Sequence, residues 1–229
     1  MTTLTLISSM ATKALLADLT RLYEAAHPGV RVQIESVGGV DAAKRVQAGE
    51  VFDGVVLASN AIDKLMGEGH VRAGSRADLV TSGVAVAVRA GQPLPDLSSE
   101  AALREAVLAA PTLGYSTGPS GVQLAALFER WGIASTIAPR IVQAKPGIPV
   151  ASMIASGDVA LGFQQLSEML GVPGITIAGP LPDAVQIITT FSGSVAQNSP
   201  QPEAMQHLLA FWQSAACDAA KRQQGMDPA

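Results

Sequence analysis

The sequence contains very little of several residue types, and each scarcity excludes a class of protein. One cysteine among 229 residues, Cys217, rules out an internal disulfide, and we interpret it as a small packing residue in an alanine-rich helical stretch. The three histidines have no partner at metal-ligand spacing, and the spacing shows no Ser-His-Asp or Cys-His arrangement. We therefore expect no metal, no cofactor and no hydrolytic triad.

Charge and long apolar runs are also scarce. Charged residues make up 15% of the chain, the net charge is −4, and the Lys and Arg residues are scattered. No basic stripe could neutralise a row of phosphates, so nucleic acid is not an expected partner. Apolar residues make up 48%, but no run approaches the roughly 18 residues that span a bilayer, so we expect a soluble chain without membrane insertion.

The hydrophobic periodicity predicts an α/β protein in which strands and helices alternate and parallel strands dominate. Strands are predicted over residues 3–7, 31–36, 54–58, 84–88, 112–115, 140–143, 160–163 and 175–177, with a β-rich stretch over 186–195. Helices are predicted over residues 11–27, 40–48, 60–66, 100–108, 122–131, 150–155, 203–213 and 216–224. Asn60 is predicted to cap the helix that ends at Met66.

Three strand-to-helix turns consist of small polar residues and glycines: Ser8-Ser9-Met10, Ser36-Val37-Gly38-Gly39 and Ser116-Thr117-Gly118-Pro119-Ser120-Gly121. In an open parallel sheet such turns lie at the carboxyl ends of the strands, where ligands bind. Each turn leaves backbone N–H groups and a partial positive charge at a helix start, which suits an anion. The third turn has neither Walker nor dinucleotide-binding spacing, so nucleotides are disfavoured.

The order of these segments resembles the type 2 periplasmic binding proteins, above all the molybdate-binding proteins of ABC transporters. The resemblance covers nearly the whole chain and depends on "SSMATKALLADLTRLYEAAHPGVRV", "VGGVDAAKRVQAGEVFDGVVLAS", "YSTGPSGVQLAALFERWGI", "MIASGDVALGFQQ" and the ending "PEAMQHLLAFWQSAACDAAKRQQGMDP". It implies a two-lobed α/β fold with mixed sheets, in which two crossing strands serve as a hinge and the lobes close on a small anion in the cleft. The implied lobes are residues 1–80 plus 194–229, and residues 81–193.

The sequence departs from that family where the ligand would bind. Molybdate-binding proteins typically offer a serine at each of the first two helix starts and a tyrosine after the late strand. In this chain the second serine is replaced by Gly38 or Gly39, and the tyrosine by Gln164 or Gln165. A pocket with fewer hydroxyls and more amides is roomier and has planar donors, which favours carboxylates over a compact oxyanion.

The candidate ligand-binding residues lie in these turns and after the late strand. They are Ser8, Ser9, Met10, Gly38, Gly39, Val40, Ser59, Thr117, Ser120, Gly121, Gln164 and Gln165. Gln164 and Gln165 are expected on a short loop, and only one of these successive side chains should enter the cleft. Lys13 and Ser9 are the catalytic candidates, while Glu168 is expected on the outward side of a short helix.

Two functions remain open. In the first, the protein binds a small organic anion, such as a di- or tricarboxylate, and presents it to a transporter or sensor. In the second, suggested by a resemblance to aconitate isomerase, it is a cofactor-free isomerase that moves a proton along an allylic system. The first residues show no secretion leader, which predicts the cytoplasm if Met1 is native and the periplasm if a leader has been removed.

Overall fold

The computed structural model describes residues 1–144 and 148–229, and within these ranges the chain divides into two units. Unit 1 contains residues Met1–Ser82 and Thr189–Ala229, and unit 2 contains Gly83–Ile188. Two strands, β4 (Ala77–Arg89) and β9 (Ile188–Val195), cross the boundary between the units. The predicted α/β class is confirmed, with parallel and antiparallel strand pairs in both units.

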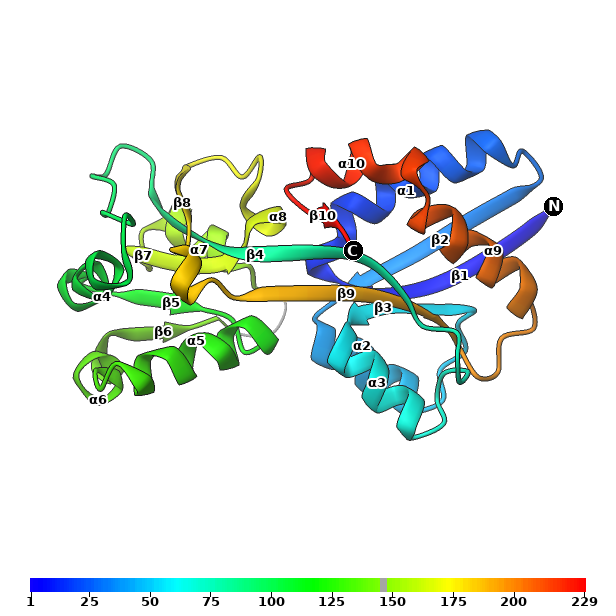
Figure 1. Ribbon diagram of the computed structural model, residues 1–229, viewed down its shortest axis with the longest axis horizontal. Helices are drawn as coiled ribbons and strands as arrows, with labels where there is room; N and C mark the ends of the chain where they lie inside the picture. Colours follow the sequence, from blue (N-terminus) through cyan, green and yellow to red (C-terminus); the bar gives the residue numbers. More distant parts are fainter. Residues whose placement is uncertain (145–147) are drawn as a thin grey trace. The chain divides into compact units, whose positions relative to one another are not determined.

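Unit 1 begins with three strand-helix pairs and ends with helices α9 and α10 followed by the short strand β10 (Figure 1). Besides parts of β4 and β9, its elements are β1 (Thr2–Ser9), η1 (Met10–Thr12), α1 (Lys13–Ala26), β2 (Val30–Val37), α2 (Gly39–Gln47), β3 (Gly54–Ala58), α3 (Ser59–Gly67), α9 (Pro202–Gln213), η4 (Ala215–Cys217), α10 (Asp218–Gln223) and β10 (Asp227–Pro228). The strand order is β2-β1-β3-β9, in which β1 pairs in parallel with β2 and β3, and β9 runs antiparallel to β3.

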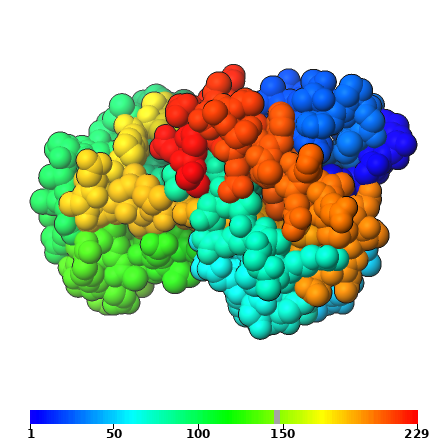
Figure 2. All heavy atoms as spheres, turned by 45° about the vertical axis from the view of Figure 1, so that its right-hand side comes forward, coloured from blue at the N-terminus to red at the C-terminus, as the bar shows by residue number. Residues whose placement is uncertain are grey.

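Both faces of the unit 1 sheet are covered around strand β3, which is buried at every position. Along β3, Val56 and Ala58 join one core with α1 and α9, while Val55 and Leu57 join the other with α2 and α3. This alternation follows from the two-residue period of a strand. Helices α9 and α10 lie beside α1 on the first face (Figures 1 and 2).

Unit 2 repeats this design with shorter strands (Figure 1). Its elements are the rest of β4, then α4 (Glu100–Ala109), β5 (Leu113–Tyr115), α5 (Pro119–Arg130), α6 (Ala134–Ile137), η2 (Ala138–Arg140), β6 (Ile141–Gln143), α7 (Val150–Ser156), β7 (Leu161–Gln165), α8 (Leu166–Met169), β8 (Ile175–Pro180) and η3 (Asp183–Val185). Strand β5 pairs in parallel with β6 and β7, and β4 is antiparallel to β7 and β8.

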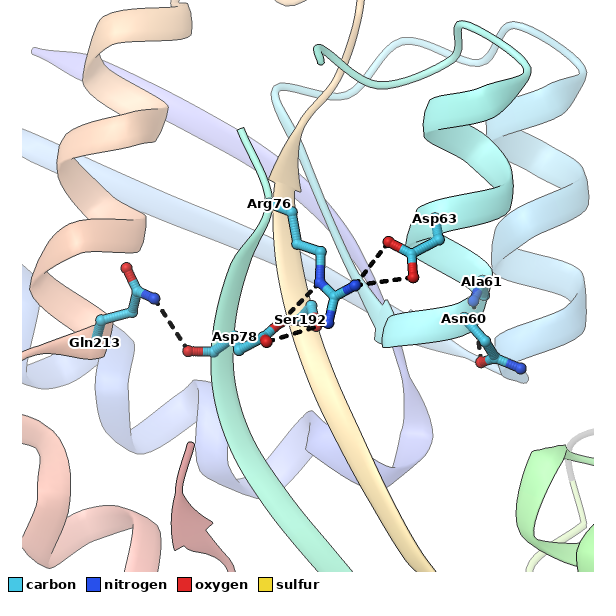
Figure 3. Close-up of polar contacts among 7 residues, drawn as sticks. All are labelled: Asn60, Ala61, Asp63, Arg76, Asp78, Ser192 and Gln213. Atoms are coloured by element: carbon cyan, nitrogen blue, oxygen red, sulfur yellow. Dashed lines mark hydrogen bonds and ion pairs between the residues drawn. The ribbon is translucent and has the colours of Figure 1, made fainter. Parts of the chain in front are cut away.

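A polar cluster in unit 1 links helix α3 to the boundary-crossing strands (Figure 3). The Arg76 guanidinium donates to both Asp63 oxygens at 2.7 and 2.8 Å and, through Nε, to Asp78 Oδ1 at 2.8 Å. Ser192 Oγ on β9 also donates to Asp78 Oδ1, and Gln213 Nε2 on α9 donates to the Asp78 carbonyl. One arginine therefore holds α3 against β4, and one aspartate joins β4 to β9 and α9.

Several predicted boundaries were wrong, each for a local reason. Helix α5 begins at Pro119 and not at Val122, because proline fits the first helical position, where no N–H is needed. The N-cap of α3 is Ala58; Asn60 lies inside the helix, where its Oδ1 accepts from the Ala61 N–H (Figure 3). Strand β4 is longer than the predicted 84–88, and the predicted helix 216–224 is split into η4 and α10.

Candidate functional site

In unit 1, the expected ligand-binding residues lie together at one edge of the sheet. Strands β1, β2 and β3 are parallel, and register pairs Ser9 with Val37 and Ser8 with Val56. The three strands therefore end side by side, and each is followed directly by a helix start. This edge carries the expected residues Ser8, Ser9, Met10, Gly38, Gly39, Val40 and Ser59.

The two serines at the end of β1 differ in what their hydroxyls can do. The Ser8 hydroxyl is fully buried and hydrogen-bonds the Ser36 hydroxyl at 2.8 Å, so it joins β1 to β2. Ser9 is the N-cap of η1, and its Cβ lies 3.6 Å from where a Cβ on Gly39 would be. The end of β1 and the start of α2 are therefore neighbours, and a Cβ at position 39 would make only an ordinary van der Waals contact with Ser9.

The helix starts at this edge are not capped by side chains. The N-cap residues of α2 and α3, Gly38 and Ala58, make no side-chain hydrogen bond to the first turn. Most other helices of the described residues also lack a side-chain cap; α4 is the exception, since the Ser99 hydroxyl at its N-cap accepts from the Ala102 N–H at 3.1 Å. Backbone donors at the α2 start remain available to a ligand, although Asp41 places a carboxylate in the same turn.

Unit 2 has a corresponding edge, formed by the ends of β5 and β7. Register pairs Tyr115 with Phe163, so the turn that follows Tyr115 begins beside Gln164. The N-cap of α5, Gly118, offers no side-chain hydrogen bond, and Pro119 has no N–H. Ser120 and Gly121 therefore supply the amide donors at the α5 start. This edge carries the expected residues Thr117, Ser120, Gly121, Gln164 and Gln165.

The α5 start is packed so closely that it depends on glycine. A Cβ on Gly121 would lie 1.8 Å from the Ser116 carbonyl oxygen, whereas a Cβ on Gly118 would meet only the Ser116 Oγ at 3.5 Å. Gly121→Ala should therefore displace the turn and reduce the free energy of unfolding by about 1–3 kcal/mol. Gly118→Ala is the matched control, and urea denaturation of both variants checks the difference. Equal stability of the two variants would contradict this packing.

The expected loop at Gln164 and Gln165 was wrong, because both residues lie in strand β7 and both are buried. Gln164 Oε1 accepts a hydrogen bond from the Ala151 N–H at 3.0 Å, in the first turn of α7. Successive strand side chains point to opposite faces, so Gln165 points away from this contact. The strand continues through both residues because β7 pairs with β4 up to Gln165 and Val84.

The prediction that Glu168 faces outward was also wrong. It lies on α8 directly after β7, is partly buried, and hydrogen-bonds the Gln164 side chain. Burial raises the pKa of the Glu168 carboxyl to about 7, and the hydrogen bond from Gln164 opposes this rise. The four-residue helix α8 is too short to give a periodic pattern, so only the spacing from Gln164 could have suggested the contact.

Lys13, the other catalytic candidate besides Ser9, is the first residue of α1. Its side chain is exposed, and no ion pair within residues 1–144 and 148–229 includes it. No three His, Cys, Asp or Glu side chains of the described residues are grouped so that they could hold a metal ion. The helices of the described residues also include none with both the length and the hydrophobicity of a membrane span.

A groove of about 990 Å³ in unit 2 lies away from the residues described above. It is lined by the end of β4, the following loop, α4 and the residues that lead into β5 and β7. These are the amino ends of β5 and β7, opposite the edge that carries Gln164. The groove is therefore not part of the candidate site, despite its size.

Exposed apolar side chains accompany three of the helix starts. Val40 in the first turn of α2 is 50% exposed, Val122 in the first turn of α5 is 64% exposed, and Ile148 just before α7 is 47% exposed. Each edge thus offers both polar backbone donors and hydrocarbon surface. A ligand with a carbon skeleton can use both kinds of contact, whereas a small inorganic oxyanion uses only the first.

Comparison with known proteins identifies the family of the chain. Residues 4–227 match the family described as "Bacterial extracellular solute-binding protein". An aconitate isomerase from Pseudomonas sp is 36% identical over 233 residues, which cover 99% of this chain and 88% of the relative. The resemblance to solute-binding proteins and to this isomerase, expected from the motifs, is thus confirmed.

Solved structures with the same fold include anion-binding proteins. The periplasmic molybdate-binding protein of Azotobacter vinelandii has a TM-score of 0.80 and 18% identity, with 97% of this chain and 98% of that chain covered. The sulfate-binding protein of Mycobacterium tuberculosis has a TM-score of 0.79 and 15% identity, with 100% and 87% covered. At such identities the likeness establishes the fold alone. Together with the match over residues 4–227, it shows that the chain belongs to the family of bacterial extracellular solute-binding proteins.

Proposed function

We propose that the protein binds a small organic anion with several carboxylates at helix starts that follow the carboxyl ends of its strands. The observation that carries this proposal is the set of helix starts without side-chain caps, at α2 and α3 in unit 1 and at α5 in unit 2. All lie after the carboxyl ends of strands, the place where α/β sheets bind ligands, with residues 116–118 between β5 and α5. Backbone N–H groups at such starts favour a negative charge.

A carboxylate ligand is favoured over molybdate or sulfate by what surrounds these donors. The α2 start carries Gly38 and Gly39 and therefore no hydroxyl, and Val40 and Val122 expose hydrocarbon. The family's tyrosine is matched here by Gln164 or Gln165, and the Gln164 amide already hydrogen-bonds Ala151 and Glu168. Delivery of the anion to an ABC transporter fits the family to which the chain belongs.

A thermal-shift screen tests the ligand class. Molybdate, sulfate, citrate, cis-aconitate and trans-aconitate are compared at equal concentration and ionic strength. A ligand at about a hundred times its dissociation constant adds roughly 2.7 kcal/mol to the free energy of unfolding, so a tricarboxylate should raise the melting temperature measurably. A shift with molybdate or sulfate and none with the organic acids would contradict the carboxylate proposal.

We infer a second candidate function, the isomerisation of an unsaturated tricarboxylate. The observation that favours it is the 36% identity to an aconitate isomerase along nearly the whole chain, well above the 18% or less shared with the solute-binding structures described above. Such a reaction needs an anion site and a group that exchanges a proton with carbon, and no cofactor. Incubation with cis-aconitate, followed by NMR for the trans isomer, separates an isomerase from a receptor.

A further inference from the structure

Two consecutive contacts in unit 2 connect a helix start to a partly buried carboxyl group. The Ala151 N–H in the first turn of α7 donates to Gln164 Oε1 at 3.0 Å, and the Gln164 side chain in turn hydrogen-bonds Glu168. We propose that Glu168 is the catalytic group that takes and returns the proton in the isomerisation, and that Gln164 is its positioning residue. This inference depends on the second candidate function.

Gln164 is well suited to hold the carboxyl in one place. With Oε1 accepting from Ala151, its amide nitrogen is the atom that faces Glu168, so the amide cannot flip without losing both contacts. Strand β7 fixes the Gln164 backbone through pairing with Ala85 on β4. Glu168 follows four residues later on α8, so strand and carboxyl move as one element.

Glu168 also lies at the edge where the proposed anion binds. Tyr115 on β5 and Phe163 on β7 are strand partners. The next residue after Phe163 is Gln164, and the turn into α5 begins directly after Tyr115, so both lie at the same end of the paired strands. The amide donors of Ser120 and Gly121 are thus presented from the strand next to β7. The earlier candidates are less suitable, because Lys13 is exposed and a serine hydroxyl needs a separate base.

The environment of Glu168 suits proton transfer near neutral pH. Its carboxyl pKa is raised to about 7 by burial, against the opposing hydrogen bond from Gln164. Both the base and the acid form are therefore populated at neutral pH, which is the condition for a group that must first accept and then donate a proton.

The proposed step is balanced without any co-reactant. The Glu168 carboxylate takes a proton from the methylene carbon next to a substrate carboxylate, and the C–H electron pair spreads over that carboxylate and the adjacent double bond. Backbone N–H groups at the α5 start stabilise the negative charge of this dienolate. Glu168 then returns the proton to the far carbon of the allylic system, which moves the double bond and restores the carboxylate.

The main test compares Glu168→Gln with Glu129→Gln, a control on the exposed side of α5 in the same unit. Turnover of cis-aconitate should fall at least about 100-fold in kcat in Glu168→Gln, while KM and the calorimetric affinity change by less than about threefold. In D2O the variant should also lose exchange of the substrate methylene protons. Glu129→Gln should match the native protein in every readout.

A pH profile separates proton transfer from a structural role. The native kcat/KM should rise with an inflection near pH 7, and Gln164→Leu should move that inflection upward, because the hydrogen bond that lowers the Glu168 pKa is lost. Melting temperatures at pH 8 check folding. Glu168→Gln should be at least as stable as the native protein there, since it removes a carboxylate that burial disfavours.

Two results overturn the proposal in distinguishable ways. If the native protein turns over cis-aconitate and Glu168→Gln keeps kcat within about threefold, Glu168 is not the catalytic group although the isomerase function stands. If the native protein binds tricarboxylates and shows neither turnover nor methylene exchange, the isomerase function fails, and with it the role of Glu168, while the binding function remains.

Discussion

Gly118→Asp should weaken tricarboxylate binding about 100-fold while it makes the free protein more stable by roughly 0.5–1 kcal/mol. Gly118 is the N-cap of α5, and its φ of −72° and ψ of −178° suit any residue. An aspartate there can accept from the orphan N–H groups of the first turn and complement the helix dipole. The same carboxylate would occupy the position that we assign to the ligand and would repel it.

The matched control is Gly118→Asn, which has nearly the same shape and capping ability but no charge. It should stabilise the helix to a similar extent and lose less affinity, so the difference between the two variants isolates the electrostatic part of binding. Calorimetric titration with cis-aconitate, at two salt concentrations, measures both affinities. If the native protein and Gly118→Asp bind cis-aconitate with equal affinity, the α5 start is not part of the binding site.

Trp212→Ala should lower the free energy of unfolding by about 3–5 kcal/mol, a large part of the stability of a typical domain. Trp212 on α9 is fully buried and belongs to the core that joins α1 and α9 to the sheet of unit 1. Its truncation removes many apolar contacts and leaves a cavity that the surrounding leucines cannot fill. Urea denaturation followed by circular dichroism measures the loss.

Trp212→Phe should be much less costly, about 1 kcal/mol, because the indole N–H has no acceptor among the described residues. The replacement therefore reduces the volume of the side chain but removes no hydrogen bond. In both variants the remaining tryptophan, Trp131, lies in unit 2, where its indole N–H donates to Glu100 at 2.6 Å. Trp131 fluorescence therefore reports on the unfolding of unit 2. If the substitution weakens only unit 1, the urea midpoint measured by this fluorescence should stay close to that of the native protein.

Most elements were predictable because local rules and burial agree along this chain. The run Gly54–Ala58 is apolar at every position after glycine and forms a strand buried on both faces, as its pattern predicts. The turns that lead into α2 and α5 were predicted from composition alone, whereas the predicted turn at Ser8-Ser9 was wrong, because both serines are the last residues of β1. The first half of β4, where apolar and polar residues are mixed, was missed, since its strand conformation depends on partners distant in sequence, such as β10.

The sequence by itself determined the α/β alternation, the family and the helix starts that carry amide donors, because periodicity, glycines and serines act over a few residues. Only the tertiary structure decided what individual side chains do. Burial in unit 2 and the contact with Gln164 turn Glu168 from an expected surface residue into a carboxyl that can titrate near neutral pH. A pKa depends on desolvation and on groups brought together by folding, and neither can be inferred from the neighbouring residues in the sequence.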